Sequence, residues 1–166
     1  MIDQNILLRA RALLEDVTPQ LADCGKLCGA ACCQSDEDGL GGMFLFPGEE
    51  SLIGDADWAH IAPNRALGGC KLLTCEGRCD REQRPLACRI FPLTPTALKN
   101  GGFGVRIDRR SFAVCPLAVG GLPGLDPQFV HAVRDAISLI ATDPAGASFL
   151  RAYAKLERQF ASIVPF

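Results

Sequence analysis

Apolar side chains recur every three to four positions near the start of the chain, and this spacing predicts a helix over residues 3–17. Its apolar stripe consists of six residues: Ile6, Leu7, Ala10, Leu13, Leu14 and Val17. Since only one face of such a helix is apolar, we expect that face to pack against the rest of the chain.

Two further helices are predicted near the end of the chain. Asp126 followed by Pro127 supplies an N-cap acceptor and then a preset φ, and Asp143-Pro144 repeats this signal. We therefore expect helices over about 127–141 and 145–163, a pair that fills about residues 126–164. Their apolar stripes contain Phe129, Val133, Ile137 and Ile140, and then Phe149, Leu150, Tyr153, Leu156, Phe160 and Ile163. These stripes could cover each other, the first helix and one side of the middle segment, or form a dimer contact.

The segment between these helices, residues 18–125, has a different character. It contains 16 of the 17 glycines, 8 of the 11 prolines and all nine cysteines. Two short apolar runs predict strands at Met43–Phe46 and Phe103–Ile107, which could pair as a small β ribbon. A short helix is expected around residues 56–62. This segment has few long apolar elements whose burial could offset the backbone entropy that it loses on folding. We therefore expect that something else stabilises it.

The length of 166 residues and the apolar content of 48% suffice for one packed core, and we interpret residues 1–166 as a single domain. The expected fold class is mainly α, with an irregular, cysteine-rich middle that is stabilised by metal. This cysteine-cluster module covers about residues 20–120. The formal net charge of −2 argues against a broad basic surface for nucleic acid.

The role expected of the cysteines depends on whether the cellular compartment is reducing or oxidising. The first residues lack the basic start and uninterrupted apolar run of a secretory signal, and no apolar run is long enough to span a membrane. We therefore expect a cytoplasmic protein with reduced thiols and no membrane partner. Nine is an odd number, so a complete intramolecular disulfide set is excluded. A disulfide framework remains the main alternative to metal binding.

The cysteines form two clusters and one isolated residue. In order, they are Cys24, Cys28, Cys32 and Cys33, then Cys70, Cys75, Cys79 and Cys88, and finally Cys115. Tight clusters that are joined by long loops are typical of thiolate sites for zinc or iron–sulfur clusters. Burial as ordinary apolar residues explains nine cysteines in a loop-rich segment less well.

The spacing within the first cluster suggests more than one metal ion. Cys24, Cys28 and Cys32 are four residues apart, so in a helix they would share one face. Cys33 would point about 100° away from Cys32 in that helix. The pair therefore suits two metal ions, or one polynuclear cluster, better than a single ion. His60 and His131 are the only histidines and are expected to be packing or surface residues, so the ligands should be all or nearly all sulfur.

Charged residues accompany the second cluster. Arg84 and Arg89 flank Cys88, and each could donate N–H groups to sulfur or pair with a carboxylate. Alternatively, both are solvated surface arginines. Glu49 and Glu50 follow the first predicted strand and could simply favour a helix N-terminus.

The cysteine pattern and the segment Arg84–Pro92, which reads RPLACRIFP, resemble the YkgJ-type cysteine-cluster family. This family is described as a zinc- or iron-chelating domain with a CxxCxxCC signature, and the flagellin lysine methylase is a larger relative whose iron–sulfur cluster is attributed to these cysteines. The resemblance covers about residues 20–120. It implies eight metal ligands: Cys24, Cys28, Cys32, Cys33, Cys70, Cys79, Cys88 and Cys115. It also implies a glutamate after the first predicted strand, where this chain has Glu49 and Glu50.

The chain departs from this family in two ways. Its first cysteines are separated by three residues rather than two. Cys75 is a ninth thiol that could replace Cys70 as a ligand.

The expected function is metal binding by an all-thiolate, multi-metal site, with Zn²⁺ as the leading ion. The alternative is an iron–sulfur protein that takes part in electron transfer or in a protein modification such as lysine methylation. A thiol protein that forms disulfides on oxidation is a third hypothesis. No motif identifies catalytic residues, an organic cofactor or a protein partner.

Overall fold

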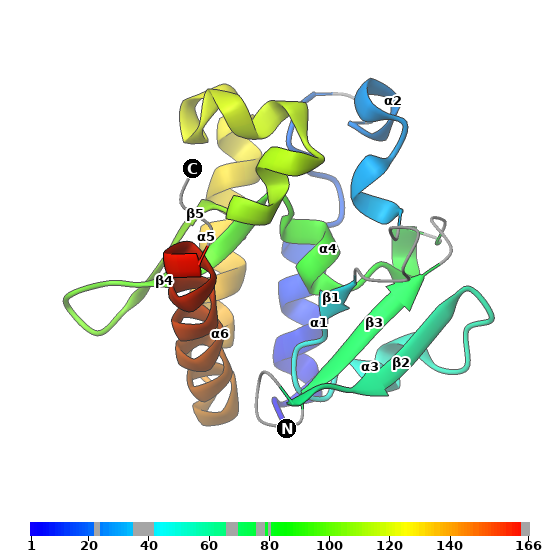
Figure 1. The fold of residues 1–166 in the computed structure, drawn as a ribbon. Helices are drawn as coiled ribbons and strands as arrows, with labels where there is room; N and C mark the ends of the chain where they lie inside the picture. Colours follow the sequence, from blue (N-terminus) through cyan, green and yellow to red (C-terminus); the bar gives the residue numbers. More distant parts are fainter. Residues whose placement is uncertain (22–23, 35–41, 66–69, 76–78, 80, 164–166) are drawn as a thin grey trace.

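The structure is a computed structural model that describes residues 1–21, 24–34, 42–65, 70–75, 79 and 81–163, with the side chains of the last helix as far as Gln159. Helices make up about 51% of it and strands 15%. The prediction of a mainly helical chain with a small amount of β structure is confirmed. Figure 1 shows three longer helices beside two small sheets.

The first helix, α1 (Gln4–Leu13), begins where its cap predicts. The Asp3 carboxylate accepts hydrogen bonds from the N–H groups of Asn5 (2.8 Å) and Ile6 (3.3 Å). The helix ends earlier than predicted, and Val17 lies beyond it. The predicted apolar stripe is buried at Leu7, Ala10 and Leu14, whereas Leu13 is exposed.

The two C-terminal helices, α5 (Pro127–Ile140) and α6 (Pro144–Ile163), match the predicted bounds to within one residue. Asp126 accepts a hydrogen bond from the N–H group of Gln128, and Asp143 accepts from Ala145 and Gly146. The stripes are buried in the core at seven positions: Phe129, Val133, Ile137, Ile140, Phe149, Leu150 and Tyr153. Helix α5 packs on α1 and on strand β5, and α6 packs on strand β4.

The strands form two antiparallel sheets instead of one ribbon. The first contains β1 (Met43–Phe44), β3 (Lys71–Cys75) and β2 (Ala59–Pro63) in that order, and the second pairs β4 (Leu93–Ala97) with β5 (Phe103–Ile107). The prediction that the strand at residues 43–46 pairs with Phe103–Ile107 is therefore wrong, and the first of them is two residues shorter. The helix predicted around residues 56–62 is also wrong, because pairing along the whole of β3 holds β2 extended.

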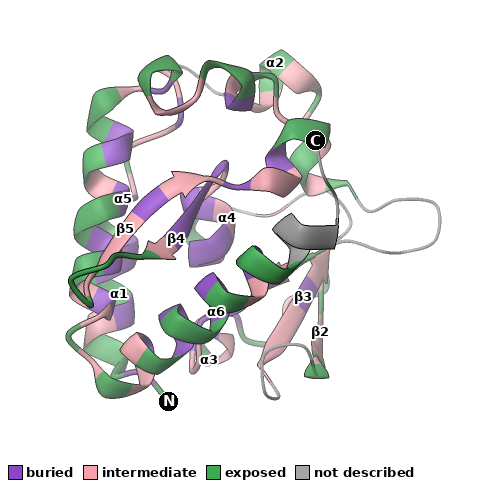
Figure 2. Ribbon diagram, turned by 60° about the vertical axis from the view of Figure 1, so that its left-hand side comes forward, coloured by how far each residue is buried: buried purple, intermediate pink, exposed green. Residues whose placement is uncertain are grey.

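Short helices connect these elements. They are α2 (Gly25–Cys28), η1 (Ala31–Cys33), α3 (Glu50–Ile53), η3 (Arg81–Gln83), α4 (Leu86–Ile90), η4 (Arg109–Ala113), η5 (Pro116–Gly120) and η6 (Leu122–Gly124). Helix α4 contacts α1 and both sheets, through β1 and β4, so it lies at the centre of the fold. Figure 2 shows that α4 is largely buried, whereas α2 is not. Within the described ranges, none of the helices combines the length and apolar character that a membrane span requires.

Candidate metal centre

The first cysteine cluster folds as two short helical turns. Cys24 precedes α2, Cys28 ends it, and Cys32 and Cys33 lie in η1. Between the turns, Gly29 (φ 60°) and Ala30 (φ 57°) adopt left-handed conformations. The segment is therefore not the single helix in which Cys24, Cys28 and Cys32 would share one face, because two successive left-handed residues end α2.

The remaining cysteines come from four places in the fold. Cys70 precedes β3 and Cys75 ends it, Cys79 lies in the following loop, Cys88 lies in α4, and Cys115 precedes η5. In α4 the four residues around Cys88 are buried, and Cys88 faces the more open side. All nine cysteines are free thiols, and only Cys32 is exposed.

Eight of the nine cysteines line two adjoining cavities. The larger, of about 70 Å³, we call the outer cavity; its thiols are those of Cys24, Cys28, Cys32, Cys33, Cys88 and Cys115. The smaller, of about 40 Å³, we call the inner cavity; its thiols are those of Cys32, Cys33, Cys75, Cys79 and Cys88. Segments more than 80 residues apart in the sequence thus converge here. Cys88 lines both cavities, whereas Cys28 lines only the outer one and Cys79 only the inner one.

Short contacts join the two cysteine clusters. The Sγ atoms of Cys32 and Cys33 are 4.0 Å apart, and the Cys75 thiol lies 3.8 Å from the carbonyl oxygen of Cys33. The Cys28 thiol points back along α2 to the carbonyl oxygen of Cys24, at 3.9 Å. Cys75 is therefore a neighbour of Cys33 although 42 residues separate them.

Cys70 lies apart from the other cysteines. It lines neither cavity, packs partly against the main apolar core, and has the Glu50 carboxylate as its charged neighbour. Burial, and to a smaller degree Glu50, raises the pKa of the Cys70 thiol. Of the two alternatives left open by the sequence, the structure places Cys75 and not Cys70 beside the other thiols.

The thiols influence each other's protonation. A hydrogen bond with Cys33, together with burial, raises the pKa of Cys32, whereas the same hydrogen bond and the nearby Arg84 guanidinium lower the pKa of Cys33 to about 6. Burial, followed by the charges of Cys33, Cys75 and Cys79, raises the pKa of Cys88. A cation in this cluster would relieve the repulsion between thiolates.

Arg84 lines both cavities and is the one charged residue, among those described, that they share. Its guanidinium lies near the sulfur atoms of Cys79, Cys33 and Cys88. Burial opposes ionisation of Arg84, but its interaction with Cys79 and the thiolate charges outweigh it and raise its pKa. Its Nε atom is buried and has no hydrogen-bond partner within the described part of the chain. The interpretation of Arg84 as a donor to sulfur is therefore favoured over that of a solvated arginine.

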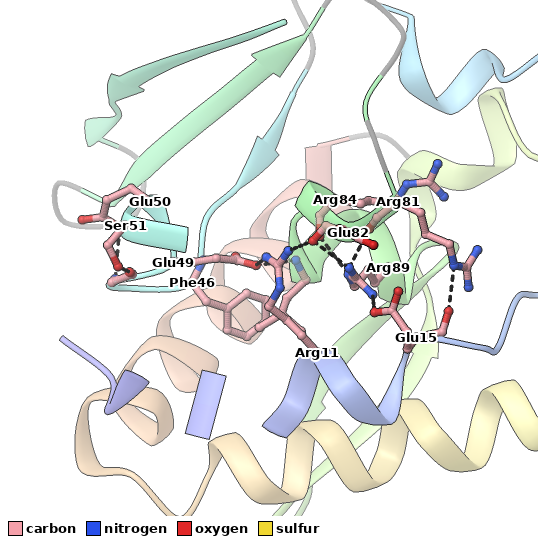
Figure 3. A network of polar contacts seen from close by, with 12 residues as sticks. Arg11, Glu15, Phe46, Glu49, Glu50, Ser51, Arg81, Glu82, Arg84 and Arg89 are labelled. Carbon is pink, nitrogen blue, oxygen red and sulfur yellow. Dashed lines mark hydrogen bonds and ion pairs between the residues drawn. The ribbon is translucent and has the colours of Figure 1, made fainter. Parts of the chain in front are cut away.

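Arg89 is a structural clamp, and its side chain is only 3% exposed. Nε donates to the carbonyl oxygen of Arg84 (2.9 Å), and Nη2 donates to those of Arg81 (2.6 Å) and Glu82 (3.1 Å). Nη1 pairs with the Glu15 carboxylate at 2.7 Å. Figure 3 shows these contacts gathered on one side of α4. Arg89 thus fixes the segment that carries Arg84, and it is not a surface residue.

Glu49 is completely buried and holds the start of α4. Its carboxylate accepts hydrogen bonds from the N–H groups of Leu86 (2.6 Å) and Phe46 (3.2 Å) and pairs with Arg11 at 3.3 Å. Burial raises the pKa of Glu49 to about 7, although these three partners favour the charged form. The sequence did not reveal this role of Glu49, and it did not reveal Arg11 as its partner. The position of Arg11 inside an apolar stripe was the one sign that this charged side chain is buried.

The histidines lie on the surface, as predicted. His60 is exposed on β2, and His131 is exposed on α5, where it faces Asp135 at 3.7 Å. In the described part of the chain, no group of three or more histidine, cysteine, aspartate or glutamate side chains is arranged so as to hold a metal ion. The thiols therefore line common cavities without being arranged as a finished coordination shell.

Comparisons with known proteins add no family assignment. No protein-family model matches the chain, and no match was found among curated proteins or solved structures. The similarity to the YkgJ-type family therefore stays a hypothesis that depends on the motifs alone.

Proposed function

We propose that this protein binds soft metal ions through an all-thiolate site that holds more than one ion, with Zn²⁺ as the leading candidate. The observation that carries this proposal is the convergence of eight thiols, from separate segments, on two cavities that share a wall. Thiolate is the preferred ligand of zinc, and four thiolates form a closed tetrahedral site.

The position of each cysteine supports one change to the eight ligands that the family resemblance implied. Cys75 replaces Cys70, since Cys75 lines the inner cavity and lies against Cys33, while Cys70 faces Glu50. The proposed ligands are thus Cys24, Cys28, Cys32, Cys33, Cys75, Cys79, Cys88 and Cys115. With both histidines on the surface, the ligand atoms are all sulfur.

Closed four-thiolate zinc sites act structurally, and each contributes on the order of 10 kcal/mol of folding free energy in small peptides. That amount is comparable to the stability of a whole domain. This free energy of metal binding would offset the conformational entropy that the glycine-rich middle segment loses on folding. Thiolate ligands must stay reduced, so the proposal includes a reducing compartment such as the cytoplasm.

The second candidate is an iron–sulfur protein that serves in electron transfer or in a modification reaction such as lysine methylation. The observation that favours it is the sharing of Cys32, Cys33 and Cys88 between the cavities, since polynuclear clusters bring many thiolates together. In both cases Arg84 would donate an N–H group to a sulfur ligand.

Elemental analysis of protein purified without air tests the proposal. Zinc at more than one ion per chain in a colourless protein supports the first candidate. Iron and sulfide with visible charge-transfer absorption support the second. Nine titratable thiols without bound metal, in protein purified from metal-supplemented cells, would refute both and favour a redox-active thiol protein.

A further inference from the structure

Arg84 lies where the two cavities meet, and its surroundings divide the thiols into two sets. Cys24, Cys28 and Cys115 line the outer cavity only, and Cys75 and Cys79 line the inner cavity only. The other three, Cys32, Cys33 and Cys88, line both. The Cys75 thiol lies 3.8 Å from the carbonyl oxygen of Cys33, and Cys88 lies near Cys33, Cys75 and Cys79, so we assign Cys33 and Cys88 to the inner set. Cys32 has Cys33 as its first neighbour and then Cys28 and Cys24, and we assign it to the outer set. Each set then contains four thiols.

We propose that these sets form two four-thiolate centres, and that Arg84 is a positioning residue shared by both, donating N–H groups to sulfur and offsetting their negative charge. The outer centre consists of Cys24, Cys28, Cys32 and Cys115, and the inner centre of Cys33, Cys75, Cys79 and Cys88. This inference rests on the proposed function and adds the division of the ligands and the coupling between the centres.

The charge balance explains why a shared cation is needed. Four neutral thiols that bind one divalent ion release four protons to solvent and leave a centre of charge −2. Two such centres carry −4, and they meet at Cys32 and Cys33, whose sulfur atoms are 4.0 Å apart. Filling one centre therefore opposes filling the other. Arg84 reduces this opposition, because its charge lies at the wall of both cavities.

Arg84 is better placed for this role than its neighbouring arginines. The Arg89 guanidinium is committed to three carbonyl oxygens and Glu15, and Arg81 donates to the carbonyl oxygens of Glu15 and Val17. Arg84 instead lines both cavities beside Cys79, and its buried Nε has no acceptor among the described residues. A metal-bound thiolate is an acceptor that would satisfy this group.

Replacing the Arg84 side chain should leave its backbone contact intact. The Arg89 side chain binds the carbonyl oxygen of Arg84, not its guanidinium. Arg84→Gln removes the charge, and Arg84→Lys keeps the charge but changes the donor geometry. Arg134→Gln, at an exposed position on α5, is the matched control.

The test is an anaerobic titration of reduced, metal-free protein with Co²⁺, followed by competition with Zn²⁺. The sulfur-to-cobalt charge-transfer band reports both centres. Trp58, the one tryptophan, lines the inner cavity, so quenching of its fluorescence by Co²⁺ reports the inner centre. Elemental analysis gives the number of ions per chain.

We expect two ions per chain in the wild type and in Arg134→Gln, with the second bound more weakly than the first. Arg84→Gln should weaken binding roughly 10- to 100-fold and shift the charge-transfer band to lower energy, because sulfur loses its hydrogen-bond donor. Arg84→Lys should recover part of the affinity but not the band position. Cys28→Ser should remove one ion and keep Trp58 quenching, whereas Cys79→Ser should remove the quenching.

The other outcomes separate the two levels of the proposal. A wild-type protein that binds no metal overturns the proposed function. Two bound ions with unchanged affinity and band position in both Arg84 variants overturn the role of Arg84 alone. A single ion per chain, or loss of all metal in both cysteine variants, overturns the division into two centres. If Arg84→Gln does not fold, the band position in Arg84→Lys decides.

Discussion

Arg89→Met is expected to destabilise the metal-free protein because it removes the clamp on the segment before α4. The methionine keeps much of the apolar stem and loses four hydrogen bonds, to Glu15 and to the carbonyl oxygens of Arg81, Glu82 and Arg84. The substitution therefore separates the polar contacts of Arg89 from its packing.

The size of the expected loss of stability depends on which other hydrogen bonds each acceptor oxygen keeps after the substitution. The carbonyl oxygen of Glu82 still accepts from Arg11, and that of Arg81 still accepts from the N–H group of Arg84 at 3.2 Å. The Glu15 side chain is 41% exposed and can be solvated. One charge-assisted hydrogen bond, to the carbonyl oxygen of Arg84, is therefore lost at full value and the other three at reduced value, and we expect a total loss of about 3 kcal/mol in the free energy of unfolding.

Urea unfolding of reduced protein in the presence of a chelator measures this loss. Arg9→Met, at an exposed position on α1, is the control and should change the stability by less than about 0.5 kcal/mol. Zinc affinity should also fall in Arg89→Met, because the carbonyl contacts position Arg84 and the segment that follows Cys79. A loss below about 1 kcal/mol, together with unchanged zinc affinity, would refute the clamp.

Three other predictions concern the thiols and Glu49. Cys75→Ser should lower the number of bound metal ions, while Cys70→Ser should retain them all. Equal losses by elemental analysis would contradict the assignment of Cys75, in place of Cys70, as a ligand. Chelation should increase hydrogen exchange in α2 and η1, which contain no buried residues, far more than in α4, where four of five are buried. Between about pH 4.5 and 7 the metal-free protein should lose stability as the pH rises, because the folded state keeps the Glu49 proton to about pH 7 and the unfolded state does not. Denaturation of Glu49→Gln across this range should show a smaller slope.

The helices at both ends of the chain could be predicted because their signals are local. Asp126-Pro127 and Asp143-Pro144 fix where α5 and α6 begin, and the apolar stripe fixes the face that is buried. The extended state of Ala59–Pro63 could not be predicted in this way, since it depends on pairing with β3. The buried Arg11 has its ion-pair partner 38 residues away, and no spacing rule connects the two.

The gathering of the thiols could be expected from their clustering, but the choice between Cys70 and Cys75 could not. Five residues along an extended strand correspond to roughly 16 Å and to opposite faces of the sheet. The direction of β3 therefore brings one of them to Cys33 and the other to Glu50. The antiparallel pairing of β3 with β1 and β2 determines which end of β3 lies beside the cavities.

The segment Arg84–Pro92 links the two halves of the proposed site. Helix α4 has five residues, too few to be stable alone, and it is held by Glu49 at its start and by Arg89 on its side. Cys88 is thus placed by contacts that do not need metal, whereas Cys24 to Cys33 lie on turns without a buried residue. It follows that the α4 side can offer a preformed wall, against which metal binding would order the first cluster.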